Sequence, residues 1–560
     1  MATIAPAIPS KDVEKSAGVL EDTQSREGQF TQTQRILIVA AAQFLGLLDQ
    51  TAVNTAVPTI ARNLNAGASI SWIASSFLAS STATQLIVGR LSDIFGRKTT
   101  IIGALCMVVL GELLNGFAQN PIWLYSCRAV AGFGAGSLGS QANIIISDIT
   151  TLKQRGKYFG IVGVAVVLGN GLGPVIGGLL AEKNWRWVFW LIPPLCAVSI
   201  TILAFILPGS GRKENAMARL KLVDWFGVFM TLAGTFLLLV PITQVGSTFK
   251  IDSARFIGLL TAGVTVFVVL FIVEWKFIKL PVIALYLFGQ GYGINVFIWQ
   301  NVAIGWIYFG NLYYTPQYLQ NVRGYSPSHA GTLLLPLAVT AGVSSAISGN
   351  IVSKSGRYLW AIVMGNIFWT TGLAFQAGFY NRDTKFYAIS LVGICQGIGV
   401  GFTLQNNMVG VLAHTYKRDR GVAVGLRQFT RSLAGAIGIA ASNSILSGTL
   451  RSELRDVVPG EMIGSLTAST ADLGSMGLNA AQQQAVRDAY MKGIHRIYIV
   501  YAPLAAAMLL AMLPIRDRGL KQMDEHEQKE DSRELAAVEP ELVEQKVLSE
   551  YTGNVKADAF

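Results

Sequence analysis

The stretch GRLSDIFGRKTTI, residues 89–101, lies between two apolar runs, over residues 72–91 and 99–118. Each run has the roughly 20 residues that a helix needs to cross the hydrocarbon core of a bilayer. The stretch between them carries four charged side chains, which belong in water or in the headgroup region. We therefore interpret residues 89–101 as a short loop that joins two membrane-spanning helices.

Similar apolar runs fill most of the chain, which is 52% hydrophobic and 14% charged. Such a composition excludes one or two soluble domains. A membrane β-barrel is excluded because residues 257–273 and 361–379 are apolar throughout and do not alternate in polarity. We predict an all-α polytopic membrane protein with spans at 35–57, 72–91, 99–118, 121–146, 157–181, 186–207, 223–245, 255–275, 291–315, 328–350, 358–379, 385–413, 421–446 and 493–514.

Fourteen spans place both termini on one side of the membrane. The short loops on that side carry about twice as many Lys and Arg residues as the opposite loops, so we expect cytoplasmic termini. We expect disordered cytoplasmic tails at 1–33 and 516–560, the second of them acidic, and a long non-cytoplasmic loop at 447–492. The net charge of +11 is dispersed among the loops, which argues against a nucleic-acid partner.

Glycine-rich strings recur in the two parts of the chain. The same sequence distance separates Gly132 from Gly397 and Gly156 from Gly421. We therefore predict two pseudo-symmetric six-helix bundles, at 34–208 and 281–515, with two inserted helices and a linker at 209–280. Two equivalent halves around a central site suit alternating access.

The loop at 89–101 has features beyond its positive charge. Gly89 permits close helix contact, and Gly96 permits a tight turn. Asp93 and Arg97 form a charge pair that can latch one conformation and break in another. A stop-transfer cluster explains Arg97 and Lys98, but not Asp93 with both glycines.

The predicted fifth helix contains a regular series of glycines. Gly169, Gly173 and Gly177 fall at positions i, i+4 and i+8, which gives a smooth face for another helix. Pro174 removes a backbone donor beside this face, and Gly178 follows it. From the residues alone, this face is equally well explained as simple close packing.

Several charged residues lie well inside apolar spans. Asp49 and Arg128 are costly there unless they are paired, protonated or in contact with water, and this favours a role in transport over a structural ion pair. Arg431 lies about three turns into its helix, whereas Arg427 lies one turn closer to the cytoplasm and can extend to the interface. We expect Glu112 to be structural or interfacial.

These motifs resemble those of the fourteen-spanner drug:proton antiporters of the major facilitator superfamily. Residues 89–101 look like the superfamily's signature loop, and residues 169–178 are similar to the antiporter motif of its exporters. Residues 48–58, LDQTAVNTAVP, resemble the first-helix motif of the fourteen-spanners. The resemblance implies export of small organic molecules, such as drugs, toxins or secondary metabolites, in exchange for protons, with Asp49, Arg128 and Arg431 in proton coupling.

The resemblance also implies a substrate cavity lined by the helices at 35–57, 121–146, 291–315 and 385–413. Polar uncharged side chains gather on these helices, and amides in hydrocarbon need partners or water. The predicted cavity residues are Asn54, Gln141, Asn143, Gln300, Asn301, Tyr308, Asn311, Gln405, Asn406 and Asn407.

No Walker loop, metal-ligand spacing or nucleophile elbow is present in the sequence, so we expect neither an enzyme nor a cofactor or metal. We expect a monomer whose partners are the lipid bilayer, protons and a small organic substrate. The plasma membrane is favoured over the vacuolar membrane. The alternatives are a siderophore or basic amino acid transporter of the same fold, possible at the vacuole, and, more remotely, a non-transporting nutrient receptor.

Overall fold

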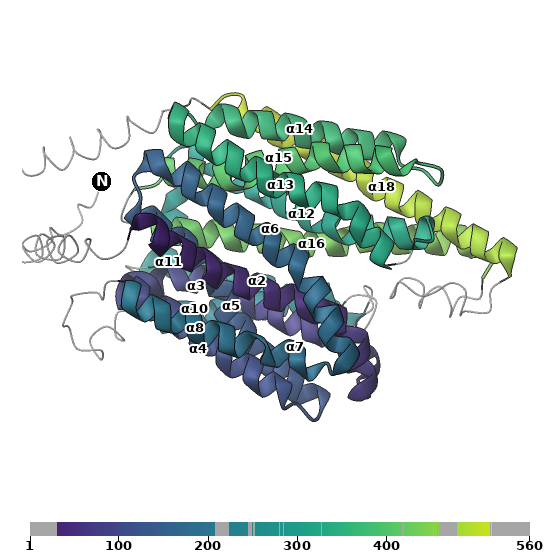
Figure 1. Ribbon diagram of the computed structural model, residues 1–560, viewed down its shortest axis with the longest axis horizontal. Helices are drawn as coiled ribbons and strands as arrows, with labels where there is room; N and C mark the ends of the chain where they lie inside the picture. Colours follow the sequence, from purple (N-terminus) through teal and green to yellow (C-terminus); the bar gives the residue numbers. More distant parts are fainter. Residues whose placement is uncertain are drawn as a thin grey trace, which may run out of the picture.

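The computed structural model describes residues 31–207, 223–244, 249, 253–278, 281–283, 285–325, 327–416, 419–455, 457–458, 479–515 and 517. The described chain is almost entirely helical and forms an elongated bundle (Figure 1). The predicted tails fall outside these residues, except for 31–33 and 517. The linker at 208–222 also falls outside them.

Each of the fourteen predicted spans coincides with one helix or, in one case, with a pair of helices. In chain order these are α2 (Gln32–Asn63), α3 (Trp72–Phe95), α4 (Arg97–Gly116), α5 (Pro121–Ile149), α6 (Leu152–Lys183), α7 (Arg186–Trp190) with α8 (Ile192–Ile206), α10 (Trp225–Thr243), α11 (Ala254–Phe277), α12 (Tyr292–Gln317), α13 (Pro327–Ser355), α14 (Leu359–Phe379), α15 (Phe386–Ala413), α16 (Arg420–Leu454) and α18 (Ala480–Met512). Short helical turns lie at η1 (Gly67–Ser71), η2 (Leu285–Gln290) and η3 (Tyr318–Val322).

Ten helices of the described chain are long and apolar enough to cross a membrane. The other four that coincide with predicted spans are α3, α5, α12 and α14. They carry many buried polar side chains, such as the serines and threonines of α3 between Ser75 and Thr84. Side chains of this kind lower the apolar content of a helix that faces other helices and not lipid.

The pair α7 and α8 replaces the single span predicted at 186–207. Pro193 and Pro194 lie in the first turn of α8. Proline has no backbone N–H and is tolerated at the start of a helix but not within it. The two prolines therefore account for a new helix start at Ile192.

The long loop predicted at 447–492 is wrong in its boundaries. Helix α16 continues to Leu454, and α18 already begins at Ala480, where Asn479 and Gln482 form a capping box. The two extensions lie against each other, with Lys492 Nζ 2.7 Å from Glu453 Oε2, and they project beyond the neighbouring helices at the right of Figure 1. Because the two extensions contact each other, each helix continues beyond the apolar run from which its end was predicted.

Equivalent glycines in the two halves make equivalent contacts. A Cβ at Gly132 would lie 2.5 Å from the carbonyl oxygen of Phe77 on α3, and a Cβ at Gly397 would lie 2.5 Å from that of Leu337 on α13. Gly134 and Gly399 likewise pack closely against α4 and α14. These matching contacts confirm the two pseudo-symmetric halves.

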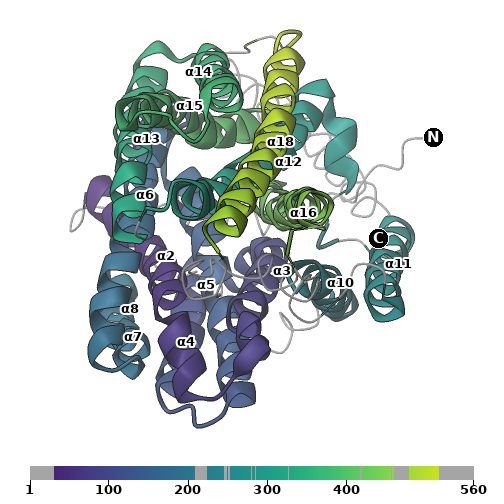
Figure 2. The ribbon, with the colours of Figure 1, turned by 90° about the vertical axis from the view of Figure 1, so that its right-hand side faces the viewer.

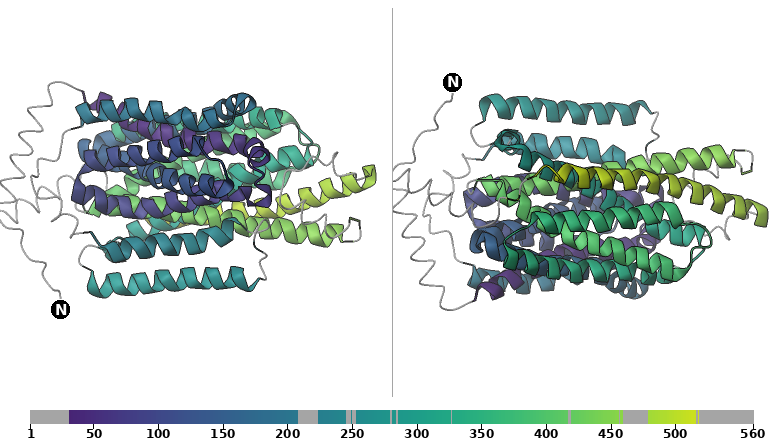
Figure 3. Two further views of the ribbon diagram at one scale, coloured as in Figure 1. Left: turned by 90° about the horizontal axis from the view of Figure 1, so that it is seen from below. Right: turned by 90° about the horizontal axis from the view of Figure 1, so that it is seen from above.

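The inserted helices α10 and α11 lie outside the two halves. They pack against each other, and α10 also contacts α3 and α16. Figure 2 shows them at the periphery of the bundle beside α3, and Figure 3 shows the same separation from two further sides. We call the end of the bundle where α2 begins and α18 ends, on the left of Figure 1, the termini end.

Candidate functional site

A buried ion cluster lies inside the N-terminal half. Arg128 Nη1 on α5 is 3.0 Å from Asp49 Oδ1 on α2 and 2.8 Å from Glu112 Oε1 on α4. All three side chains are at most 2% exposed. The Phe77 ring covers the guanidinium at 4.2 Å. The structure thus brings the predicted residues Asp49 and Arg128 together.

Glu112 belongs to the same cluster, although the sequence alone had led us to expect a structural or interfacial residue. One Arg128 guanidinium faces two carboxyl groups, so full ionisation would leave one negative charge uncompensated in a low-dielectric interior. A proton on either carboxyl removes that charge. The sequence did contain a signal for this role of Glu112, because an acidic residue in the middle of an apolar helix is costly unless it is paired or protonated.

A second charge cluster lies at the termini end. Arg97 Nη1 is 2.6 Å from Asp93 Oδ1, and Arg97 Nε is 2.7 Å from Asp148 Oδ2 on α5. Burial raises the pKa of the Asp93 carboxyl, and the adjacent Arg97 partly offsets the rise. Gly96, at a φ of 89°, makes the turn between α3 and α4.

The Asp93 carboxyl also lies beside the C-terminal half. Both of its oxygens would be 3.1 Å from a Cβ at Gly421, in the first turn of α16. The N-terminal end of a helix carries a partial positive charge that stabilises a nearby anion. Asp93 therefore contributes a favourable interaction across the two halves as long as α16 stays in this position.

Two backbone contacts between the halves accompany this interaction. A Cβ at Gly89 on α3 would lie 2.5 Å from the carbonyl oxygen of Gly421 on α16. A Cβ at Gly156 on α6 would lie 2.6 Å from that of Gly349 on α13. The two contacts occupy equivalent places in the sequence repeat. They hold the halves together at the termini end.

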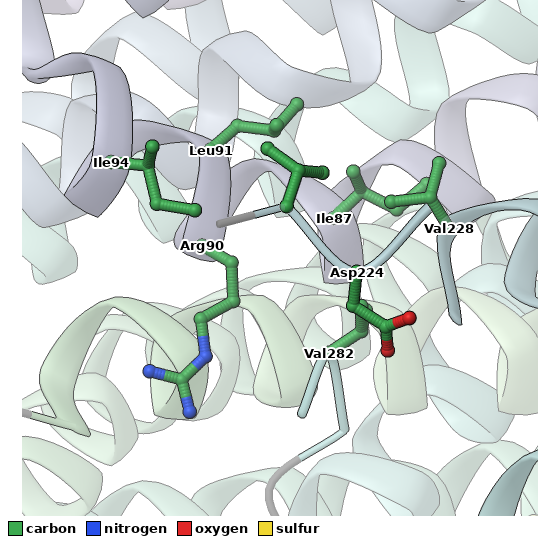
Figure 4. A pocket seen from close by; sticks show the side chains of 8 residues that line it. Ile87, Arg90, Leu91, Ile94, Asp224, Val228 and Val282 are labelled. Atoms are coloured by element: carbon green, nitrogen blue, oxygen red, sulfur yellow. The ribbon is translucent and has the colours of Figure 1, made fainter. Parts of the chain in front are cut away.

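The segment that leads from α11 into α12 crosses the same region. Arg90 Nε donates to the carbonyl oxygen of Pro281 at 2.9 Å, and Arg90 Nη2 donates to Tyr286 Oη at 3.2 Å. Tyr286 in turn donates to Asp419 Oδ1 at 2.6 Å, next to the start of α16. A small pocket between Arg90, Asp224 and Val282 lies here (Figure 4). The segment thus links both halves at the termini end.

Replacing Asp93 with asparagine is expected to reduce transport at least about tenfold, because it removes the charge that interacts with the start of α16. Asp148→Asn is the matched control, since Asp148 also binds Arg97 but lies within the N-terminal half. Initial transport rates, normalised to the amount of inserted protein, measure both effects. Equal losses in the two variants would contradict the cross-half role of Asp93.

The glycine series on α6 packs against α2. A Cβ at Gly173 would collide with the Thr51 side chain, a Cβ at Gly169 would lie 2.9 Å from Leu47 Cβ, and Gly177 is equally close to α2. Thr51 also donates a hydrogen bond to the Gly169 carbonyl oxygen at 3.0 Å. The face therefore joins two helices of one half. Pro174 is exposed on the other side of α6.

Gly173→Leu is expected to abolish transport because the new side chain cannot fit between α6 and α2. Gly178→Leu is the matched control, since a Cβ at Gly178 meets no atom within 4 Å. Transport and substrate binding of detergent-purified protein distinguish the two readings of the motif. Retained binding by Gly173→Leu indicates a blocked motion, whereas loss of folding leaves only the packing role.

A network of amides lies inside the C-terminal half. Asn407 Nδ2 donates to Gln300 Oε1 at 2.6 Å, and Asn301 Nδ2 donates to Asn407 Oδ1 at 2.6 Å. Arg427 Nε donates to the same Asn407 oxygen at 3.1 Å. Three of the predicted cavity residues thus form one network with an arginine that had been placed elsewhere.

The prediction that Arg427 extends to the interface is wrong. Its side chain is 2% exposed and is held by Asn407, by Gln428 Oε1 at 3.1 Å and by the carbonyl oxygen of Leu404 at 2.6 Å. Three acceptors inside the bundle offset the cost of burial. Arg431, one turn further along α16, is partly exposed and lies near Tyr308, not with Asp49 and Arg128.

This network approaches the N-terminal half at Gly139 on α5. A Cβ at Gly139 would lie 3.5 Å from Gln428 Nε2 on α16 and 3.7 Å from Gln43 Nε2 on α2. Gln141, on the same helix, is fully buried, and neither of its amide atoms has a hydrogen-bond partner in the described chain. Side chains of both halves therefore meet at the level of the amide network.

The remaining predicted cavity residues lie in several places. Asn143 and Asn406 are buried and donate to carbonyl oxygens of their own helices. Gln405 is near Gly163 on α6, at the boundary between the halves. Asn54 is exposed, and Asn311 bonds Gln396 and Gln376 in a separate network within the C-terminal half.

Comparison with known proteins identifies relatives over most of the chain. Residues 39–439 match the profile of the Major Facilitator Superfamily. Citrate exporter 1 of Yarrowia lipolytica is 34% identical over 91% of this chain and 76% of its own length. MFS-type transporter clz4 of Cochliobolus lunatus is 34% identical over 86% of each chain, and efflux pump dotC of Dothistroma septosporum is 29% identical over 85% and 83%.

Solved structures of the same fold are similar at lower identity. The human organic anion transporter MFSD10 gives a TM-score of 0.55 at 14% identity, over 86% of this chain and 100% of its own. A double tryptophan mutant of XylE gives a TM-score of 0.55 at 14% identity, over 87% and 97%. At this identity the similarity concerns the fold.

Proposed function

Because the chain belongs to the Major Facilitator Superfamily, we propose that it is a secondary active transporter that exports small organic molecules in exchange for protons. The observation that carries the proposal is the buried cluster in which Asp49 and Glu112 share Arg128. A site with two carboxyls and one cation can hold one extra proton at little electrostatic cost. Relatives named efflux pumps support the direction of transport.

In the proposed cycle, a proton enters the cluster when it is accessible from the outside. Protonation of Asp49 or Glu112 weakens its attraction to Arg128 and changes how α2, α4 and α5 are held together. Substrate leaves in this state, and the proton is released after the halves have rocked to expose the cluster to the cytoplasm. In this proposal Asp49 and Arg128 keep the coupling role that the family resemblance implied, and Glu112 takes the place of Arg431.

The contacts at the termini end act as the gate in this proposal. Asp93 at the start of α16 and the Gly89–Gly421 and Gly156–Gly349 contacts form when that end is closed, and they separate when it opens. With both termini cytoplasmic, this is the cytoplasmic gate. The plasma membrane is the expected location, and the protein acts as a monomer.

The substrate is an organic molecule that fits between the amide network and α5. One relative is named a citrate exporter, which favours an organic acid as one candidate. A basic amino acid is less suited, since both carboxyls of the central cluster already face Arg128. A siderophore remains an alternative, and a non-transporting receptor a more remote one.

Expression in a drug-sensitive host, with a panel of toxic compounds, organic acids and amino acids, tests the proposal. The cells are expected to accumulate less of at least one compound than cells without the protein. A protonophore should abolish the difference, because the pH gradient drives export. Export that persists after collapse of the gradient would rule out proton exchange.

A further inference from the structure

The C-terminal half carries two arginines, Arg427 and Arg431, for which the described residues provide no ion-pair partner. Within the described chain, helices α12, α14 and α15 contain no charged side chain. Helix α16 has its single acidic side chain at Glu453, which pairs with Lys492. Glu453 is 22 positions from Arg431, or about 33 Å along the helix. Arg427 and Arg431 are therefore not neutralised by their own helices.

The neighbours of the two arginines are neutral groups. Arg427 donates to two side-chain amides and one backbone carbonyl, which take up its N–H groups but bring no charge. Arg431 makes no hydrogen bond within the described chain, and its Nε is buried without a partner. The two guanidinium groups also repel each other, because they are one helical turn apart.

Arg128, a buried arginine of the N-terminal half, differs from these two because it has carboxyl partners. It has two carboxyl groups within 3.0 Å. Arg427 is buried and Arg431 is partly exposed, and neither has such a partner, so an anionic ligand that approaches both would supply the missing charge. Arginine binds carboxylates through paired N–H groups, so a carboxylate is a well-matched ligand.

The position of the pair suits a ligand that both halves contact. Gln428 follows Arg427 directly and lies near Gly139 and Gln43 of the N-terminal half. Gln300 Nε2, in the amide network of Arg427, is a buried donor without a partner. Tyr308 on α12 adds aromatic surface near Arg431, and the Arg431 carbonyl oxygen lies against Gly305 of the same helix α12.

We propose that Arg427 and Arg431 bind the negatively charged group of the substrate, so that the transported molecules are organic anions bearing at least one carboxylate. This inference rests on the proposed transport function and assigns the substrate class at the same central site. Arg427 is held rigidly by its three acceptors. Arg431, which has no such bonds, adapts to the bound anion.

The test is equilibrium binding to the full-length protein in detergent, measured by calorimetry. The probes are citrate, the amphipathic anion carboxyfluorescein and the lipophilic cation tetraphenylphosphonium. The variants are Arg431→Gln and Arg431→Lys, with Arg451→Gln as the matched control, since Arg451 is an exposed arginine of the same helix. Thermal unfolding of each variant establishes that it is folded.

At least one of the two anions is expected to bind the wild type and Arg451→Gln. Arg431→Gln should weaken that binding about tenfold or more, and Arg431→Lys should restore part of it, because lysine keeps the charge but loses the paired N–H groups. The inference is overturned if neither anion binds the wild type, or if the anion binds Arg431→Gln as tightly as the wild type.

Failure of this inference is distinct from failure of the proposed function. Export of tetraphenylphosphonium driven by a pH gradient, with no binding of either anion, would leave proton-coupled export standing and refute the anion site. Arg431-dependent binding of an anion, with no flux that follows the pH gradient, would support the anion site and refute the coupling.

Discussion

Reconstituted protein with Asp49→Asn is expected to show no transport driven by a pH gradient, while it still binds substrate. Asparagine has nearly the shape of a protonated aspartic acid, so it fixes one carboxyl of the cluster in its proton-bound form. Glu112 and Arg128 then balance each other permanently, and no proton needs to enter or leave. Paired measurements of equilibrium binding and gradient-driven flux on wild type and variant test this expectation.

Glu112→Gln is the informative companion variant. Both carboxyls contact the same Arg128 Nη1, at 2.8 and 3.0 Å, so we expect this variant also to lose coupled transport. Glu453→Gln, in the ion pair between the projecting ends of α16 and α18, is the matched control and should transport normally. Flux that still follows the pH gradient in Asp49→Asn would remove Asp49 from the coupling mechanism.

The second large effect is expected from Gly156→Leu. Gly156 and Gly349 approach so closely that a side chain at position 156 would meet the backbone of α13. Backbone atoms cannot move aside as a flexible side chain can, so the halves cannot close at the termini end. We expect transport to fall at least about tenfold, because overpacking costs roughly 1–3 kcal/mol.

Accessibility of an engineered cysteine tests the state in which this variant is arrested. In a background with the four native cysteines replaced by serine, Ser432→Cys introduces a thiol between α16 and Gln85 of α3. An impermeant maleimide added from the termini end should label it faster in Gly156→Leu than in the parent. Gly171→Leu is the control, since nothing lies within 4 Å of its Cβ position. Equal labelling rates in Gly156→Leu and in the parent would contradict the proposal that the contact between Gly156 and Gly349 closes the termini end.

The sequence was sufficient to predict the helices and the repeat that relates the two halves. Membrane spans follow from apolar length, and the repeat places Gly132 and Gly397 at equivalent contacts, as the structure confirms. Helix ends beyond the apolar run were not predictable in this way. The extensions of α16 and α18 depend on a capping box and on a contact between residues far apart in the sequence, such as Glu453 and Lys492.

Predicting the site succeeded for residues whose cost in a membrane is evident and failed where the partner matters. Asp49 and Arg128 were selected because each alone is costly in hydrocarbon, and the structure joins them. The roles of Glu112 and Arg427 were predicted only from their positions along their own helices. Their burial became interpretable only with Arg128 and Asn407 beside them, because pairwise geometry decides whether a polar group can be buried.

Exchange of protons for substrate is the central feature of the proposed mechanism, and proton movement across the membrane of liposomes measures it directly. Purified protein is reconstituted into vesicles that contain a pH-sensitive dye, at equal pH on both sides, and a transported compound is then added outside. We predict that inward movement of substrate drives protons outward, so that the interior becomes more alkaline in wild type and remains unchanged in Asp49→Asn. Substrate uptake without any change of internal pH in the wild type would contradict the account.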